Sequence, residues 1–429
     1  MKGIQAEAAL KSGKNLSGAW SALRHRNFRL FWLGQLFSLV GSWMQAVAQA
    51  WLILELTGSA FLLGLVGTLQ FAPILLFSLF TGVLADRFPK RSLLLVTQSV
   101  MMALALALGL LTLTGVVQYW HVLVLASLGG LAHALDMPAR QSLIIELVGR
   151  QDLMNAIALN AMVFNGARVV GPAVAGILIS MVGLAVCFLL NAASFVAVLT
   201  GLWLIRLNGE VVKKQGNGGS MLGEIKEGLQ YIMKTPFVKY GLALMGVMSV
   251  FAMNFHVLIP VFAREVLGQG PRGFGLLMSA LGAGALIGSV SLAYFSRWEP
   301  KRALIIAGAL VMCVSQIMLA PVRLFPLSLF LLLVTGWAMI TFTASLNSSI
   351  QLRVPDHLRG RIMSVYFLLF VGMMPFGSLL SGAVSRLWGS PAALALGAAI
   401  GLVGVAWLGR GLIMAGRDQD RGNSGTTCR

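Results

Sequence analysis

Residues that could form ion pairs gather in one short stretch, Gly82-Val83-Leu84-Ala85-Asp86-Arg87-Phe88-Pro89-Lys90-Arg91, between two long apolar segments. An acid and three bases stand there in a chain of which only 11% is charged. A carboxylate at the edge of an apolar medium is costly unless it is paired. Lys90 and Arg91 need no more than an anchoring role. Asp86 needs a partner, which Arg87, Arg91 or the positive end of another helix would supply.

Arg168 stands inside another apolar segment, just before Gly171-Pro172. A guanidinium within a membrane costs at least about 2.5 kcal/mol, so we expect Arg168 to face the protein interior and to have a partner. Asp136 is one candidate partner, although we expect it nearer the surface. Pro172 removes a backbone donor and kinks the helix. The alternative is a packing kink at which Arg168 extends to the membrane surface.

Uncharged polar side chains recur on one face of the first apolar segment. Gln35, Ser42, Gln45 and Gln49 share that face, and they either join helices or line a cavity. Other polar groups within apolar segments are Gln70, Asn160, Asn165, Asn191, Asn254, His256, Gln316 and Asn347. Together they indicate a weakly polar, uncharged cavity with aromatic and methionine walls, which suits a bulky amphiphilic molecule.

Several classes of function are excluded by what the sequence lacks. It has no nucleophile elbow, Walker loop or carboxylate pair, and its three cysteines and five histidines form no cluster. We therefore expect no enzyme activity, no metal, no cofactor and no use of ATP. The net charge of +18 would suggest nucleic acid in a soluble protein, but the bases cluster in particular loops. We expect no nucleic-acid partner.

The composition indicates that lipid surrounds most of the chain. Hydrophobic residues make up 58% of the 429 residues, and a soluble domain carries about twice the observed share of charged residues. A spanning helix needs about 20 apolar residues. Segments that meet this length predict an all-α integral membrane protein with twelve transmembrane helices, near residues 28–54, 60–84, 92–115, 119–138, 155–180, 184–206, 237–263, 273–295, 303–320, 324–349, 361–384 and 391–413.

The longest polar break divides these segments into six and six. It predicts a linker at 207–236 between bundles at 28–206 and 237–413, with a basic segment at 1–27 and a tail at 414–429. Its Gly/Ser part reads as flexible, and the stretch from Met221 to Met233 as a surface helix. Most of the 32 Lys and Arg residues fall on the side of the N-terminus, which predicts that both termini are cytoplasmic.

Two weak repeats relate the two halves. Phe88-Pro89-Lys90-Arg91 follows the second segment, and Glu299-Pro300-Lys301-Arg302 follows the eighth. Gly171-Pro172-Ala173-Val174-Ala175-Gly176 in the fifth segment corresponds to Gly377-Ser378-Leu379-Leu380-Ser381-Gly382 in the eleventh. The shared order predicts two pseudo-symmetric six-helix bundles.

The chain resembles the major facilitator superfamily (MFS) from about Leu23 to Leu412. The most specific match is 82–91, which resembles the signature G-x-L-A-D-R-x-G-R-R, with Pro89 and Lys90 as departures. The stretches 55–59, 136–141 and 165–172 resemble the bacterial exporter branch that includes the enterobactin exporter and macrolide-efflux proteins.

This resemblance assigns conformational roles to several residues. It implies that Asp86, with Gly82, Arg87 and Arg91, braces the second helix against the start of the eleventh near Gly360-Arg361-Ile362 and holds the cytoplasmic side closed. It also implies that the motif containing Arg168, Gly171 and Pro172 lets the fifth helix approach the other half and limits leakage.

Three groups are candidates for proton coupling. Asp136 closes the fourth segment, and Pro138 is expected to end its helix. Asp136 caps that helix or pairs with Arg140, serves as a second gating acid, or binds a proton. Glu55 caps the first segment or couples protons. His256 is a structural hydrogen-bonding group or a titrating switch.

The resemblance implies secondary active export of a drug or siderophore by alternating access, with proton antiport. The partners would be this small molecule, protons and the lipid bilayer, and we expect a monomer in the bacterial inner membrane. A lipid or lysolipid flippase of the same fold is the alternative. A non-transporting membrane sensor or scaffold is a weaker one, because it has no reason to keep polar groups inside the membrane.

Overall fold

A computed structural model describes residues 20–149, 151–205, 221–295 and 301–424. For residues 78–87, 221–225, 293, 295, 301, 356 and 415–424 within these ranges it describes the backbone alone. The described residues form helices and turns without a strand, which confirms the all-α class. The helices are η1 (Ser21–Arg24), α2 (Arg26–Thr57), α3 (Ala60–Arg87), α4 (Lys90–Leu113), α5 (Tyr119–Val148), α6 (Leu153–Val182), α7 (Leu184–Leu204), α8 (Met221–Lys234), α9 (Pro236–Phe251), α10 (Phe255–Glu265), α11 (Pro271–Phe295), α12 (Lys301–Leu319), α13 (Phe325–Arg353), α14 (Asp356–Phe370) and α15 (Met374–Ser424).

The helices account for twelve membrane crossings. Eleven helical stretches of the described residues are long and apolar enough to span a membrane. The last of them, His357–Met414, is 58 residues long and turns back at Gly389, where φ is 82°. It therefore contributes two crossings, as the apolar windows 361–384 and 391–413 predicted.

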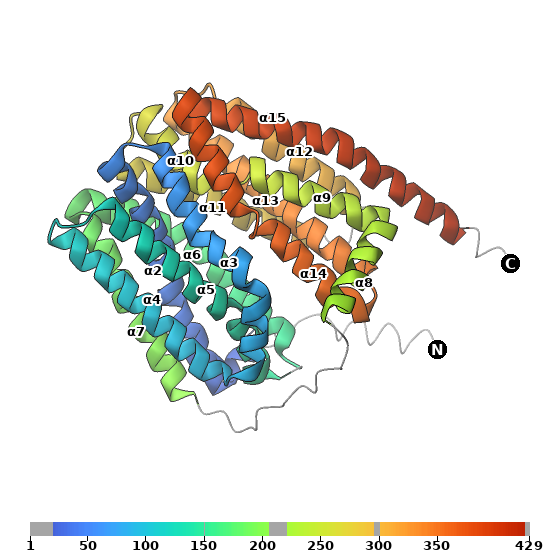
Figure 1. Ribbon diagram of the computed structural model, residues 1–429, viewed down its shortest axis with the longest axis horizontal. Helices are drawn as coiled ribbons and strands as arrows, with labels where there is room; N and C mark the ends of the chain where they lie inside the picture. Colours follow the sequence, from blue (N-terminus) through green and yellow to red (C-terminus); the bar gives the residue numbers. More distant parts are fainter. Residues whose placement is uncertain (1–19, 150, 206–220, 296–300, 425–429) are drawn as a thin grey trace, which may run out of the picture.

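Two bundles with matching internal contacts lie side by side (Figure 1). In the first, α3 packs on α5, and α7 packs on both α2 and α4. In the second, α11 packs on α13, and the part of α15 after Gly389 packs on both α9 and α12. Between the bundles, α6 meets α11, and the first part of α15 meets α3. Each contact has its counterpart when the halves are exchanged, which confirms the predicted pseudo-symmetry.

The two ends of the molecule are distinguished by α2. We call the end at which α2 begins at Arg26 the terminal end, and the end at which α2 stops at Thr57 the distal end. The α2–α3 turn at Gly58, the α10–α11 connection and the turn at Gly389 lie at the distal end. The α3–α4 and α5–α6 connections lie at the terminal end.

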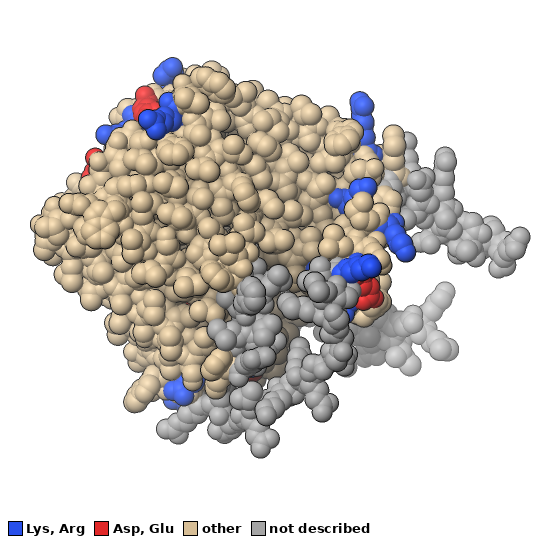
Figure 2. Space-filling view, in the orientation of Figure 1, with Lys and Arg blue, Asp and Glu red and all other residues tan. Residues whose placement is uncertain are grey.

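Charged side chains avoid the middle of the molecule. On the face seen in Figure 2, Lys, Arg, Asp and Glu lie at the edges and the broad centre carries none. Large apolar side chains such as Trp203 and Val403 are exposed on the outside of the described helices. In water such a surface would be costly, so its solvent is the hydrocarbon of a bilayer.

Two spans of the second half are broken, although the sequence predicted continuous helices. The span at 237–263 divides into α9 and α10 around Ala252–Asn254, and the span at 361–384 divides into α14 and α15 around Val371–Met373. Their counterparts in the first half, α2 and α6, are continuous. Side chains bind carbonyls at the breaks: Asn254 Nδ2 donates to Val250 O (2.6 Å) and Ser249 Oγ to Phe370 O (2.8 Å). These bonds make the breaks tolerable inside a membrane.

The prediction that Pro138 ends its helix is wrong. The helix α5 passes through Pro138 and continues to Val148. A proline inside a helix costs about 3 kcal/mol. The residues beyond it repay this cost, because Ala139, Leu143 and Leu147 are buried in the core of the first half. Asp136 therefore lies within a helix and is not a helix cap at the surface.

The helix α8 occupies the second part of the predicted linker and docks on the second half. Glu227 forms an ion pair with Arg361 of α14, and the Tyr231 hydroxyl donates to Arg353 O at 3.3 Å. The helix therefore lies at the terminal end. The Gly/Ser part of the linker lies outside the described residues.

Candidate functional site

The two halves touch through closely packed backbones toward the distal end. A Cβ at Gly382 of α15 would lie 2.8 Å from Ala60 O of α3. A Cβ at Gly282 of α11 would lie 2.6 Å from Arg168 O of α6. Contacts this close require residues without side chains, and they are typical of helix packing in membranes.

Polar and aromatic contacts reinforce this closure. Ser279 Oγ donates to Val169 O at 2.8 Å, and Thr68 Oγ1 donates to Pro375 O at 2.9 Å. The Arg264 guanidinium donates to Leu54 O across the halves. The rings of Trp51 and Phe274 stack with their centroids 6.0 Å apart. The distal side is thus held closed by contacts from four helix pairs.

Toward the terminal end, α6 carries exposed side chains and has open space beside it. A Cβ at Gly166 would meet nothing within 4 Å, in contrast to the tight contacts of α6 from Arg168 to Gly176. Met162 and Phe164, on the same stretch, are 46% and 45% exposed. Along α6, the tightly packed distal part therefore ends near Arg168, and the part before it is more exposed.

Arg168 lies at this level, between the halves. Its Nη2 is 3.9 Å from Met339 Sδ of α13, and its Cζ is 5.7 Å from the centroid of the Trp43 ring. Gly171 and Pro172, one turn further along α6, are buried, and a Cβ at Gly171 would lie 2.6 Å from Trp43 Cβ. The structure brings Arg168 to both halves but pairs it with no carboxylate of the described residues.

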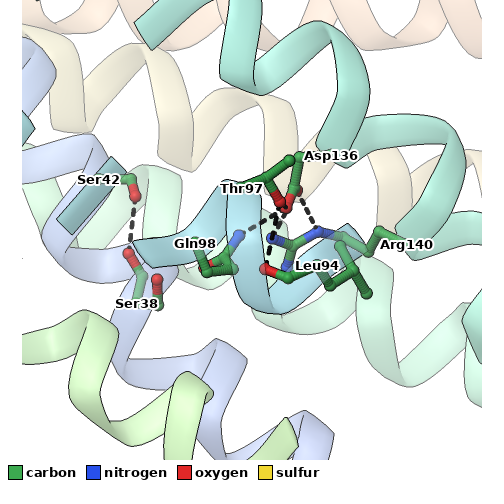
Figure 3. A network of polar contacts seen from close by, with 7 residues as sticks. All are labelled: Ser38, Ser42, Leu94, Thr97, Gln98, Asp136 and Arg140. Carbon is green, nitrogen blue, oxygen red and sulfur yellow. Dashed lines mark hydrogen bonds and ion pairs between the residues drawn. The ribbon is translucent and has the colours of Figure 1, made fainter. Parts of the chain in front are cut away.

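Asp136 pairs with Arg140 and not with Arg168 (Figure 3). Asp136 Oδ2 accepts bonds from Arg140 Nε (2.9 Å) and Nη2 (2.7 Å), while its Oδ1 accepts bonds from Thr97 Oγ1 (2.9 Å) and Gln98 Nε2 (2.7 Å). Asp136 is 1% exposed, so its side chain is buried among the helices of the first half. Both oxygens of this carboxylate are satisfied within the first half.

The polar face of α2 serves mainly to join helices of the first half. Asn191 Nδ2 of α7 donates to Gln45 Oε1 at 2.6 Å, and Gln49 Nε2 donates to Gln70 Oε1 of α3 at 3.4 Å. Ser42 Oγ donates to Ser38 O at 2.8 Å within α2 (Figure 3). Gln35 is 1% exposed, and neither polar atom of its side chain has a hydrogen-bond partner in the described residues.

The polar groups of α6 are more open. Asn165 Nδ2 donates to Ala161 O at 2.9 Å, and Asn160 is half-buried one turn before it. Both lie between Leu153 and Arg168, on the part of α6 that lies toward the terminal end.

His256 and Asn254 lie beside the two helix breaks. His256 Nε2 is 2.9 Å from Ser378 Oγ, and its ring meets the Phe71 ring edge-on, with centroids 5.6 Å apart. A Cβ at Gly67 would lie 3.2 Å from His256 Nε2. His256 therefore stands at the boundary between the halves, whereas Asn254 is buried behind it with its Oδ1 unpaired.

Glu55 is set apart from these groups. It is exposed near the distal end of α2, and its Oε1 accepts a bond of 2.7 Å from Trp51 Nε1 one turn earlier.

The charged stretch 82–91 is described only in part. For Gly82, Asp86 and Arg87 the structure describes the backbone alone. Arg91 Nε and Nη2 donate to Leu202 O (2.7 Å) and Trp203 O (2.8 Å), so Arg91 binds carbonyls that the last turn of α7 leaves free. Lys90 Nζ lies 3.7 Å from Glu146. Both bases bind within the first half.

Sequence reasoning missed the two adjacent helix breaks and the contacts of Arg264, Thr68 and Ser279 between the halves. A signal for the first break was available in Asn254 and His256, two polar residues in a largely apolar run. Arg264 and Thr68 carried no signal, because each binds a backbone carbonyl far away in the chain.

A membrane protein with twelve crossings in two pseudo-symmetric halves has the MFS fold. The model of the family described as transmembrane secretion effector matches residues 17–424. The chain therefore belongs to that family of the major facilitator superfamily.

Its relatives have named transport roles. The chain is 28% identical to the multidrug efflux pump Tap of Mycolicibacterium fortuitum over 374 residues, covering 85% of this chain and 91% of Tap. It is 23% identical to the staphyloferrin A transporter of Staphylococcus aureus, covering 84% and 90%. It is 24% identical to macrolide efflux protein A of Streptococcus pyogenes, covering 82% and 88%.

Solved structures share the fold. The nucleoside transporter NupG superposes with a TM-score of 0.70 at 12% identity, covering 91% of this chain and 98% of NupG. The D-xylose–proton symporter superposes with a TM-score of 0.71 at 15% identity, covering 89% and 96%.

Proposed function

We propose that this protein exports a bulky amphiphilic small molecule, a drug or a siderophore, across the bacterial inner membrane. The names of its relatives support both substrate classes. The observation that carries the proposal is the change along α6, which is packed on α11 from Arg168 to Gly176 and has exposed side chains at Met162 and Phe164. A molecule could enter between the halves from the terminal end and find the distal side closed.

Export would proceed by alternating access. The halves would rock about their contacts, so that the distal closure opens as the terminal side closes. The bonds across the closure, such as Ser279 to Val169 and Thr68 to Pro375, would break in each cycle. Gly82, Asp86, Arg87 and Arg91 would take part in the terminal closure, and Arg168, Gly171 and Pro172 in the distal one. For Asp136 and Arg140 the ion pair within the first half favours a supporting role.

Inward proton flow would drive the cycle, with Glu55, Asp136 and His256 as the candidate groups. His256 is the most suitable of the three by position, since it contacts Ser378 of one half and Phe71 of the other. The Asp136 carboxylate already holds Arg140, and Glu55 lies near the distal surface.

The substrate would contact the polar groups that remain accessible between the halves. Asn160, Asn165 and His256 are half-buried there, and Gln49 and Ser42 are half-buried on α2. Gln35, Gln45 and Asn254 would act behind this surface by holding helices in place. The bundles would comprise residues 28–206 and 237–413 of a monomer, with both termini cytoplasmic.

Accumulation assays test the proposal. Cells that produce the chain and cells that lack it would be loaded with a fluorescent cationic dye, a macrolide or a siderophore, with and without an uncoupler. We expect lower accumulation in producing cells and loss of the difference with the uncoupler. Equal accumulation of every compound would contradict export. Transbilayer movement of a fluorescent lysolipid that ignores the uncoupler would favour the flippase.

A further inference from the structure

Arg168 is a cation held in the middle of a membrane-spanning helix. It lies near the centre of the 30-residue helix α6, roughly 22 Å from Leu153 at the helical rise per residue. This depth is too great for the side chain to reach the membrane surface by extending along the helix. The guanidinium must therefore be accommodated inside the protein.

The acids whose side chains the structure describes are all placed elsewhere. Asp136 is committed to Arg140 within the first half. Asp152, the nearest acid along α6, lies before its first turn and accepts a bond of 2.7 Å from His25. Of the other acids with described side chains, Glu55, Glu146 and Glu265 lie near helix ends, and Glu227 lies on α8, where it pairs with Arg361. Arg168 thus has no carboxylate partner among the described residues.

The neighbours of Arg168 solvate its charge only weakly. Met339 Sδ at 3.9 Å is a poor acceptor, and the Trp43 ring, with its centroid 5.7 Å from Cζ, offers a cation–π contact. Neither is an anion. A guanidinium presents five donors in a planar fork that fits a carboxylate or a phosphate in two parallel bonds.

The surroundings of Arg168 are open on one side and apolar. Phe164, one turn before Arg168 on the same face of α6, is 45% exposed. The Phe164 ring meets the Trp43 ring edge-on, with centroids 5.8 Å apart. An acyl or aromatic tail would find these rings and Met339 beside the charged head.

We propose that Arg168 binds the anionic group, a carboxylate or phosphate, of an amphiphile that enters between the halves. The apolar part of the amphiphile lies against Trp43, Phe164 and Met339. The inference rests on the proposed function for its biological role, since it makes the exported compounds, or a lipid that occupies the same site, preferably anionic. It gives Arg168 a binding role in addition to its place in the α6–α11 contact.

Binding of short amphiphiles tests this site. The full chain would be purified and held in phosphatidylcholine nanodiscs, and tryptophan fluorescence would be titrated with octanoate, octyl phosphate, octanol and octyltrimethylammonium. We expect the Kd of the two anions to be at least tenfold lower than that of octanol, about 1.4 kcal/mol. Arg168→Gln should abolish this preference, and Arg168→Lys should keep part of it. Arg323→Gln, which changes an exposed cation at the distal end, should leave it intact.

Two results would overturn the proposal. One is a wild-type protein that binds octanol as tightly as octanoate. The other is a folded Arg168→Gln variant that keeps the anion preference. If Arg168→Gln does not fold, the wild type and Arg168→Lys still test the proposal. A wild-type protein without a preference for the anions is sufficient to contradict it.

Further measurements distinguish a lipid from a free anion at this site, and they test the anionic site separately from export. Dihexanoyl phosphatidylglycerol added from solution tests a lipid headgroup against octanoate, and Arg168-dependent binding of either supports the anionic site. Export of a dye without any anion preference would contradict the site and leave export standing. Anion preference without export of any compound would contradict export and leave the site standing.

Discussion

Gly275 of α11 faces Gly176 of α6 so closely that a Cβ at Gly275 would lie 2.9 Å from Gly176 Cα. The two residues belong to different halves, and their contact belongs to the distal closure. A larger side chain at Gly275 has no room, since the Pro172 carbonyl oxygen lies against the same point.

We therefore expect Gly275→Val to hold the halves apart at the distal end. Efflux should fall at least tenfold, while the variant still reaches the membrane. The measurement is dye accumulation together with the amount of protein in the membrane fraction. Gly270→Ala is the matched control, because a Cβ there meets nothing within 4 Å. Full efflux by Gly275→Val would show that this close packing is dispensable.

The buried pair of Asp136 and Arg140 should contribute to stability chiefly because each charge neutralises the other. Removing one partner leaves an uncompensated buried charge, which costs about 3–5 kcal/mol. Asp136→Asn should thus lower the thermal unfolding midpoint more than the double variant Asp136→Asn/Arg140→Gln does. A double-mutant cycle in detergent measures this coupling. Lys90→Gln, at the half-exposed pair with Glu146, should cost under about 1 kcal/mol. Additive effects of Asp136→Asn and Arg140→Gln would contradict the prediction.

These two cases show what could be predicted from the sequence. The number of crossings and the two halves were predictable, because apolar length and the placement of bases reflect the bilayer directly. The spacing of Asp136 and Arg140 indicated their pairing as one alternative, since both lie on one helix face. The bonds from Thr97 and Gln98 could not be predicted, because they depend on how α4 packs on α5.

The helix breaks illustrate the opposite case. Local propensity allows a helix through Ala252–Asn254, yet the helix breaks there. Pro138 locally opposes a helix, yet α5 continues through it. Packing decides both: Asn254 binds a carbonyl at one break, and buried residues beyond Pro138 sustain α5. Such contacts depend on residues distant in the chain, so they cannot be predicted from a short stretch of sequence.

Asp86→Asn should leave the protein inserted and abolish transport. The prediction follows from the resemblance of 82–91 to the MFS signature, in which the aspartate is assigned to the contact that closes the cytoplasmic side. Membrane insertion would be checked by fractionation, and transport by dye accumulation. Lys90→Gln is the control, because Lys90 binds Glu146 within the first half. Normal transport by Asp86→Asn would remove this residue from the mechanism.

The contact between His25 and Asp152 should make part of the stability acid-sensitive. The bonds from His25 and Ser21 hold the pKa of the Asp152 carboxyl below its usual value. A depressed pKa stabilises the folded state above the unfolded value of about 3.9, and this contribution is lost as the pH falls through the folded value. The wild type should therefore unfold at a higher temperature than Asp152→Asn at pH 6. The difference should shrink as the pH falls below the unfolded value. A difference independent of pH would contradict this account.

His256→Gln should separate folding from proton coupling. The glutamine amide retains a hydrogen-bonding group opposite Ser378 Oγ, which now lies 2.9 Å from His256 Nε2, so the variant should fold and insert. An amide does not titrate, so any coupling that uses the imidazole should be lost. We expect proton-driven efflux to fall at least tenfold, while downhill movement of the same dye, measured without a proton gradient, persists. Ser378→Ala is the companion variant: it removes the hydroxyl, keeps the titrating group and should retain uncoupler-sensitive efflux. If His256→Gln still exports its substrate against a gradient and still responds to the uncoupler, the proton must be carried by Glu55 or Asp136.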